Sequence, residues 1–313
     1  MRDKYSIIFM GTPGFAVPAL QALVQNGYDV ALVVTRPDRP KGRGRQLAAP
    51  PVKAKAAELN LDIVQPSTLK DERFIDQIRH IQPDFLVVIA FGHILAEKIL
   101  QVPKFGAINI HASLLPKYRG PAPIQWAIIH GERQTGVTTM LMDKGLDTGD
   151  VLLSRTEPIF VEDTSADLQQ RLALSGADLL IQTLEGYASQ KIKPVPQDHS
   201  QATYTRLLKK EDGHIEWQKT AEQLHCFIRG MTPWPGAFTY HNQNRLKVLK
   251  AALAMENVSE PAGTILAGFS NELRVATGKD ALSILEIQGP SGKHLAIADF
   301  LRGYPLPPGS VLK

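Results

Sequence analysis

The first half of the chain alternates short apolar runs with stretches whose apolar residues recur at helical spacing. The apolar runs read "SIIFM", "DVALVVT", "FLVVIA" and "GAINI", and helical patterns follow the first two from Phe15 and Pro51. This alternation is typical of β-α-β units and predicts an α/β fold with a Rossmann-like parallel sheet. Two further strands, "GVTTMLM" and "GDVLLSRTEPI", are expected on either side of the turn "DKGLDTGD", and a long amphipathic helix is expected over residues 165–189.

The pattern changes near residue 205. Residues 190–205 are rich in proline and polar side chains, which is typical of a linker. Beyond it, short strands around "HIEW", "AFTYH", "RLKVLKA", "GTILA", "LRVAT" and "LSILEIQ", with one helix near residues 221–229, predict a small OB-like β-barrel. We therefore expect a sheet domain over residues 1–189, the linker, and a C-terminal barrel domain over residues 206–313.

Composition narrows the class of protein. With 313 residues, 43% of them apolar, the chain can bury a substantial core. Its longest apolar run, residues 85–91, is shorter than the roughly 18 residues of a membrane span, and the amino end shows no apolar signal segment. The single cysteine, Cys226, argues against a disulfide framework or a multi-cysteine zinc site. We expect a cytoplasmic protein that binds no metal and no membrane.

Charge is unevenly distributed along the chain. The net charge is only +4, but residues 36–45, "RPDRPKGRGR", hold five basic side chains and one acidic side chain. Such a run is often merely a solvated surface, and it also suits the binding of an anionic partner.

Two polar side chains stand in the apolar strand of "AINIHASLLPKYRG". Strand residues alternate between faces, so Asn109 and His111 point one way and Ile108 and Ile110 the other. The pair fits either a hydrogen bond within the core or a catalytic group, because open α/β sheets bind ligands at the carboxyl ends of their strands.

The turn "DKGLDTGD" offers a carboxylate to this pair. Ordinary turn chemistry explains Asp143 and Asp150. Asp147, between the two glycines of the turn, is the aspartate best placed to approach a neighbouring strand. If it reached His111, its carboxylate would fix the tautomer of the ring and stabilise the imidazolium.

Two glycine-containing segments do not fit nucleotide-binding motifs. "GTPGFA" lacks the G-x-G-x-x-G spacing, and the second strand ends in Thr35 and Arg36 where a ribose-binding acid would be expected. "GPSGKH", at residues 289–294, lacks the rest of a phosphate-binding loop. We interpret them as a strand-to-helix turn and a hairpin turn, which disfavours a nicotinamide-dependent oxidoreductase.

Longer motifs carry a family resemblance. "INIHASLLPKYRGPAPIQWAI" and "GLDTGD" resemble the signature of the folate-dependent formyltransferases, and "GTPGFA", "RPDRPKGRGR", "ATYTRLLKKEDGHIEW" and "TPWPGAF" extend the match over essentially the whole chain. The resemblance implies transfer of a formyl group from 10-formyltetrahydrofolate to an amine. It extends in detail to the members that formylate initiator methionyl-tRNA, with a catalytic N-terminal domain, a tRNA-binding barrel and a monomeric chain.

The resemblance also implies roles for individual residues. It makes Asn109, His111 and Asp147 the catalytic trio. The folate site would be lined by Ser113, Leu114, Leu115 and Pro116, and the tRNA by Arg36, Arg39, Lys41, Arg43 and Arg45. Arg43, between Gly42 and Gly44, would be the residue that discriminates among tRNAs.

Two alternatives remain at this stage. A formyltransferase acting on an amino sugar nucleotide or a glycinamide ribotide would share the trio, although the basic segment and the barrel argue against it. A nucleic-acid-binding protein that has lost catalysis would keep the fold, although the intact trio argues against that.

Overall fold

The computed structural model describes residues 4–41, 46–254, 258–269 and 271–313, and the chain forms two compact units. Unit 1 comprises Met1–Gly120, Thr135–Pro158 and Gln169–Tyr204. Unit 2 comprises Pro121–Gln134, Ile159–Leu168 and Thr205–Lys313.

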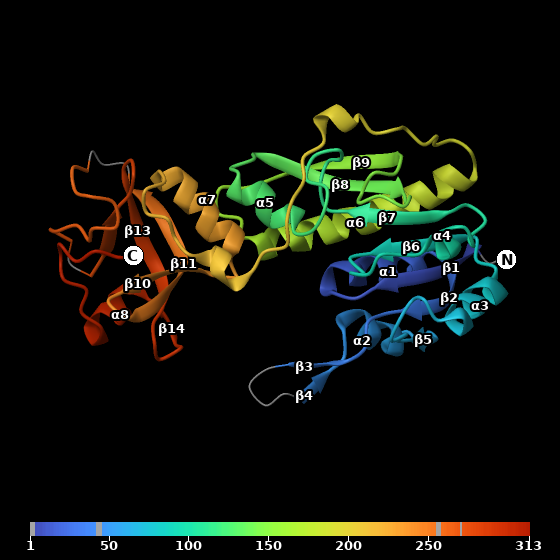
Figure 1. Ribbon diagram of the computed structural model, residues 1–313, viewed down its shortest axis with the longest axis horizontal. Helices are drawn as coiled ribbons and strands as arrows, with labels where there is room; N and C mark the ends of the chain where they lie inside the picture. Colours follow the sequence, from blue (N-terminus) through green and yellow to red (C-terminus); the bar gives the residue numbers. More distant parts are fainter. Residues whose placement is uncertain (1–3, 42–45, 255–257, 270) are drawn as a thin grey trace. The chain divides into compact units, whose positions relative to one another are not determined.

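Unit 1 is built on a seven-stranded sheet (Figure 1). Its strands lie in the order β5 (Ile63–Val64), β2 (Tyr28–Val34), β1 (Lys4–Gly11), β6 (Phe85–Ile89), β7 (Ala107–His111), β8 (Gln134–Leu141) and β9 (Val151–Pro158). The neighbours from β5 to β7 are parallel, and β8 pairs antiparallel with β7. The predicted parallel sheet is therefore confirmed, with β8 and β9 as an added strand pair.

Helices cover both faces of this sheet. They are α1 (Val17–Gln25), α2 (Pro51–Glu58), α3 (Glu72–Ile81), α4 (Glu97–Leu100) and α6 (Ser165–Ala188), with short 3₁₀ turns η1 (Gly14–Ala16) and η2 (His199–Gln201). One apolar cluster joins α3 and α4 to β1, β2 and β6. Helix α6 covers the other face beside β7 and β8, where Gly176 leaves room for Ile110 and Thr183 shares a hydrogen bond with Thr139. By strand alternation, Asn109 and His111 point to the opposite face, away from α6.

The described residues on either side of the end of the basic segment form a separate hairpin. Strands β3 (Arg39–Lys41) and β4 (Gln46–Ala48) pair antiparallel and extend away from the large sheet (Figure 1). At its base, the carboxylate of Asp38 accepts hydrogen bonds from Lys53 and Gln65, each 2.8 Å long. These bonds hold the pKa of Asp38 below its usual value.

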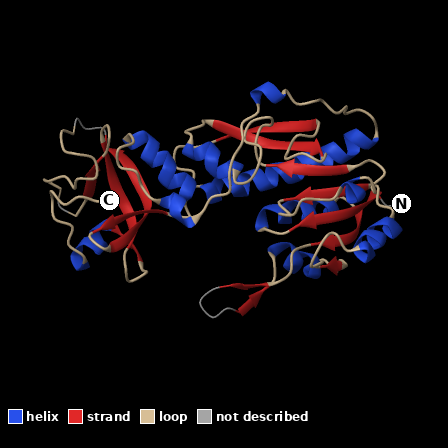
Figure 2. Cartoon of the chain, in the orientation of Figure 1, coloured by secondary structure: helices blue, strands red, loops and turns tan. Residues whose placement is uncertain are grey.

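Unit 2 contains an antiparallel sheet (Figure 2). Its order is β10 (Ala237–His241), β11 (Asn244–Ala254), β13 (Ala281–Gln288) and β12 (Leu273–Ala276), and β14 (His294–Ala296) also pairs with β13. The helical segments are α5 (Pro123–Ile129), η3 (Lys210–Gly213), α7 (Ala221–Met231) and α8 (Ile297–Gly303). The hairpin turn predicted at residues 289–294 is confirmed between β13 and β14.

Two of the strands expected in unit 2 are only isolated bridges. The segment "HIEW" contributes a single bridge, from His214 to Phe238, and "GTILA" contributes bridges at Thr264 and Ile265. In the first segment Trp217 is buried in the core, and its Nε1 donates a hydrogen bond to Thr239 Oγ1 at 2.9 Å. Burial of this large side chain, rather than a strand ladder, holds the segment in place.

The division into units differs from the boundaries expected at 189 and 205. Helix α5 belongs to unit 2 because its apolar face packs on α7, where Gly230 approaches Ile129 too closely for a Cβ atom. Residues 190–204 belong to unit 1, and the polar side chains that suggested a linker make hydrogen bonds there. Within the described residues, no helix has both the length and the apolar character needed to cross a membrane.

Candidate active site

The ring of His111 is buried between two polar partners. Its Nε2 lies 2.8 Å from the carbonyl oxygen of Tyr118, and its Nδ1 lies 3.6 Å from Oδ2 of Asp147. A carbonyl oxygen can only accept a hydrogen bond, so we assign the proton of the neutral ring to Nε2. Nδ1 then carries the free lone pair and faces the carboxylate.

Asp147 reaches His111 by folding back along the sheet. The turn leaves β8 beside the start of β7, where Met142 N donates to Ala107 O at 2.8 Å. Asp147 adopts a positive φ of 53°, and its Oδ2 accepts a hydrogen bond from Gly120 N at 2.8 Å. One backbone N–H thus holds the carboxylate in position at the far end of β7.

The glycines and the first aspartate of this turn shape it. A Cβ on Gly149 would lie 1.7 Å from Leu141 O, so only glycine fits there. The Asp143 carboxylate accepts bonds from Gly145 N at 2.9 Å and from the Thr148 hydroxyl at 2.7 Å. As expected from turn chemistry, Asp143 stabilises the turn itself.

Asn109 lies on β7 one same-face position before His111, about 7 Å along the strand. It is paired in register with Val88 and Met140 and is buried. Within the described parts of the chain, its carboxamide makes no hydrogen bond to another residue. The amide N–H groups are therefore available to a ligand.

The loop after β7 is held in shape by two hydroxyl groups. Ser113 Oγ donates to Lys117 O at 2.6 Å, and Thr138 Oγ1 donates to Ser113 O at 2.7 Å while accepting from Leu115 N at 3.2 Å. The Ser113 side chain is thus used within the loop. The partly exposed residues of the predicted folate site are Leu114, Leu115 and Pro116.

The predicted tRNA-binding residues are only partly placed. Arg36 donates a hydrogen bond to Gly92 O, in the loop that follows β6, and Arg39 is exposed at the start of the hairpin. Lys41 ends β3. Arg43 and Arg45 lie outside the described residues.

Three groups that position His111 and Asp147 could not be recognised in the sequence. Two are backbone atoms, Tyr118 O and Gly120 N, which carry no sequence signal. A third is Gln197, whose Nε2 donates to Asp147 O at 3.0 Å and to Gly149 O at 2.7 Å. Its polar surroundings in the sequence indicated a linker, and no local motif distinguishes it.

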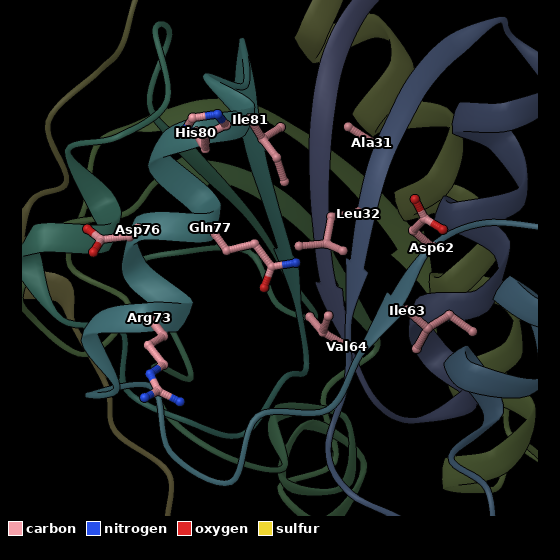
Figure 3. Close-up of a pocket in the computed structure, with 10 residues that line it drawn as sticks. All are labelled: Ala31, Leu32, Asp62, Ile63, Val64, Arg73, Asp76, Gln77, His80 and Ile81. Atoms are coloured by element: carbon pink, nitrogen blue, oxygen red, sulfur yellow. The ribbon is translucent and has the colours of Figure 1, made fainter.

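A separate cavity of about 770 Å³ lies along β2, β5 and α3 (Figure 3). Its lining combines apolar side chains of β2 and β5 with the polar side chains of Asp62, Arg73, Asp76, Gln77 and His80. It contains none of the predicted site residues. The described residues hold no group of three or more side chains able to bind a metal ion.

Residues 4–184 match the formyl transferase family, and residues 207–305 match the C-terminal domain of formyl transferases. The chain belongs to the formyl transferase family. It is 46% identical over 308 residues to a methionyl-tRNA formyltransferase of Clostridium novyi, covering 98% of this chain and 99% of that protein. A methionyl-tRNA formyltransferase of Pelotomaculum thermopropionicum is 47% identical over 307 residues, covering 98% of each chain.

A solved structure shows the same fold. The N-formyltransferase from Helicobacter canadensis, in complex with folinic acid and dTDP-3-aminofucose, matches with a TM-score of 0.69. It is 18% identical and covers 90% of this chain and 98% of its own. The expected fold class is confirmed: a parallel-rich α/β sheet followed by a C-terminal antiparallel β unit.

Proposed function

We propose that this protein transfers the formyl group of 10-formyltetrahydrofolate to the α-amino group of methionyl-tRNA, with initiator methionyl-tRNA as the preferred acceptor. The observation that carries the proposal is the pairing of His111 Nδ1 with Asp147 Oδ2, 3.6 Å apart. Asn109 lies on the same face of β7, and its carboxamide has no hydrogen-bond partner among the described residues. The relatives of 46–47% identity over nearly the whole chain, which are methionyl-tRNA formyltransferases, support this acceptor.

The residues around the trio fit a folate. When bound, 10-formyltetrahydrofolate supplies a formyl carbon attached to a nitrogen that can leave. Leu114, Leu115 and Pro116 would provide an apolar wall for its ring system, next to the polar ends of β7 and of the aspartate turn. Asn109 would direct an uncommitted amide donor towards the formyl oxygen.

The trio can stabilise the charges that formyl transfer creates. Attack by an amine places negative charge on the formyl oxygen and positive charge on the amine nitrogen. Asn109 Nδ2 and protonated His111 Nδ1 are the donors for that oxygen, and one such donor is typically worth ~10²–10³ in rate. The Asp147 carboxylate stabilises the imidazolium and accepts the amine proton, directly or through a water molecule.

The distance between His111 Nδ1 and Asp147 Oδ2 leaves both groups able to interact with a substrate. At 3.6 Å the two atoms are too far apart for a normal hydrogen bond, so neither is saturated by the other. Gly120 N occupies one lone-pair direction of Asp147 Oδ2, which leaves the rest of the carboxylate available to the substrate.

The basic hairpin supports tRNA as the acceptor. Asp38, the acidic residue of segment 36–45, is already paired with Lys53, so it does not neutralise the arginines of the hairpin. A projecting cationic hairpin suits the phosphates near the acceptor end of a tRNA. We assign Arg39, Lys41, Arg43 and Arg45 to this contact, and Arg36 to the same region.

Unit 2 offers a second surface for RNA. Arg245 lies over the ring of Phe238, 3.6 Å from its centroid, and His214 and Tyr240 are exposed next to Phe238. Guanidinium groups and aromatic faces are the groups that proteins use to bind RNA phosphates and unstacked bases. We assign this surface to the tRNA, and we propose that the protein acts as a monomer in the cytoplasm.

One experiment distinguishes the acceptor classes. The protein is incubated with labelled 10-formyltetrahydrofolate and, in parallel, a mixed pool of aminoacylated tRNAs, an amino sugar nucleotide and glycinamide ribotide. We expect label on methionyl-tRNA, more on the initiator than on the elongator species. Label on the sugar nucleotide or the ribotide alone would overturn the proposal. Light scattering of the pure protein tests the monomer.

A further inference from the structure

Arg119 is a charged side chain buried completely within unit 1. Its Nε and Nη2 atoms donate to Oε1 of Gln197, at 3.1 and 2.6 Å. Its Nη1 donates to the hydroxyl of Tyr204 at 3.1 Å and lies 3.2 Å from Nδ1 of His199. The guanidinium group therefore makes polar contacts with three side chains of the segment 197–204.

Gln197 links Arg119 to the turn that contains Asp147. The Oε1 atom of Gln197 accepts a hydrogen bond from Arg119, and its Nε2 donates to the carbonyl oxygens of Asp147 and Gly149. Both ends of this buried amide are thus satisfied. A fully satisfied buried network has few alternative arrangements, because each displaced group would leave a polar atom without a partner.

The backbone on either side of Arg119 holds the catalytic pair. The carbonyl of Tyr118 fixes Nε2 of His111, and the N–H of Gly120 holds Oδ2 of Asp147. Thr203 secures the same stretch, because its Oγ1 accepts from Tyr118 N and its carbonyl accepts from Arg119 N, both at 2.8 Å.

These bonds form a closed circuit around the site. It runs from Arg119 through Gln197 to the backbone of Asp147, through the Asp147 carboxylate to Gly120, and back to Arg119. We propose that Arg119 and Gln197 are positioning residues, which set the separation of His111 and Asp147 and keep Nδ1 of His111 as the acid-base atom. The inference rests on the proposed function, because it assigns its effect to the catalytic pair.

The test is a double-mutant cycle between Gln197→Leu and Asp147→Asn. If Gln197 acts through Asp147, Gln197→Leu lowers kcat by ~10- to 100-fold in the wild-type background, as small misplacements of catalytic groups do. It also leaves the KM for folate within about threefold. In the Asp147→Asn background the same change lowers kcat by less than about threefold, because coupled residues are not additive.

Gln201→Leu is the matched control. Gln201 belongs to the same segment and is exposed, and its side chain donates a hydrogen bond to the carboxylate of Asp198. We expect it to leave kcat unchanged in both backgrounds. Circular dichroism and the Tm of each variant report the folded fraction.

A second variant guards against misfolding. Gln197→Glu keeps an acceptor for Arg119 but has no N–H for the carbonyls of Asp147 and Gly149. We expect it to fold and to show the same loss of kcat and the same non-additivity. Equal losses in both backgrounds, for either variant, would overturn the inference and leave the proposed function standing. Full activity of Asp147→Asn alone would instead overturn the assignment of the trio, and the inference with it.

Discussion

Nε2 of His111 lies 2.8 Å from the carbonyl oxygen of Tyr118, and this contact decides which nitrogen of the ring can exchange protons with a substrate. Because the carbonyl oxygen needs a donor, Nε2 is protonated in both charge states of the ring. Nδ1 alone changes state, and it faces Asp147. The acid-base role that we propose for His111 therefore depends on a backbone atom seven residues further along the chain.

Asn109→Ala is expected to lower kcat by ~10²–10³, because it removes a donor that acts on the developing oxyanion. Affinity for tRNA should stay nearly unchanged, since the effect falls on the transition state and not on docking. Steady-state kinetics together with filter binding of tRNA measure both. Asn26→Ala, at the exposed end of α1, is the control. Wild-type turnover in Asn109→Ala would remove Asn109 from the trio.

Asp147→Asn is expected to lower kcat by at least ~10², because a neutral amide neither stabilises the imidazolium nor accepts the amine proton. Asp143→Asn is the matched control in the same turn, since among the described residues its carboxylate accepts hydrogen bonds from groups of the turn itself, Gly145 N and the Thr148 hydroxyl. We expect this control to remain within about threefold of wild type, as exposed substitutions away from the chemistry do. Comparable losses in the two variants would mean that the turn matters for folding rather than for proton transfer.

The polar positions of β7 could be predicted from the sequence because strand alternation is a local property. Asn109 and His111 share a face, opposite to Ile110 and α6, as their spacing requires. The approach of Asp147 to His111 was suggested by the glycines of its turn and by the family resemblance. Its actual route, back along β7 from Ala107, depends on the pairing of β7 with β8.

What the sequence did not reveal depends on long-range pairing. Arg119 and Gln197 are 78 residues apart, and a proline-rich polar segment gives no indication that one of its amides is buried. Helix α5 follows the loop after β7 in the chain, but its apolar face packs against α7, which lies almost a hundred residues further along the sequence. Composition identifies surface-like segments, and only the folded chain shows which of them are covered.

Gly149→Ala is expected to destabilise the protein by about 2–3 kcal/mol, the range of a severe overpacking change. A Cβ there would lie 1.7 Å from the backbone oxygen of Leu141, which cannot move aside without opening the turn. Gly14→Ala is the control, because a Cβ at Gly14 meets no atom within 4 Å. Urea unfolding of both variants gives the comparison. A Gly149→Ala variant as stable as Gly14→Ala would contradict the geometry of the turn.

Asp212 makes the stability of unit 2 depend on pH. The bidentate bond from Arg206, helped by Lys209 N, lowers the pKa of Asp212 from 3.8 to about 2. A depressed carboxyl pKa contributes stability that is fully present above pH 3.8 and is lost as the pH falls towards 2. We expect Asp212→Asn to be less stable than wild type at pH 6, with a difference that shrinks as the pH is lowered. A difference that stays constant from pH 6 to pH 3 would show that the ion pair contributes nothing.

Arg43 distinguishes two ways in which the basic hairpin can serve a tRNA. If Arg43 only neutralises phosphate charge, Arg43→Lys should formylate tRNA almost as efficiently as wild type. Arg43→Ala should then bind all tRNAs more weakly by a similar factor, with an affinity that depends less steeply on salt. If its planar guanidinium instead recognises the shape of the acceptor end, lysine should fail almost as badly as alanine.

We expect the second outcome. The flanking Gly42 and Gly44 allow close approach of the backbone to the RNA, and Arg39, Lys41 and Arg45 already supply charge in the same segment. The measurement is the formylation efficiency of wild type, Arg43→Lys and Arg43→Ala on initiator and elongator methionyl-tRNA at two salt concentrations. Arg39→Lys, at the exposed start of β3, is the matched control, and it should keep wild-type discrimination. An Arg43→Lys variant that is active and fully discriminating would show that charge alone is sufficient at this position.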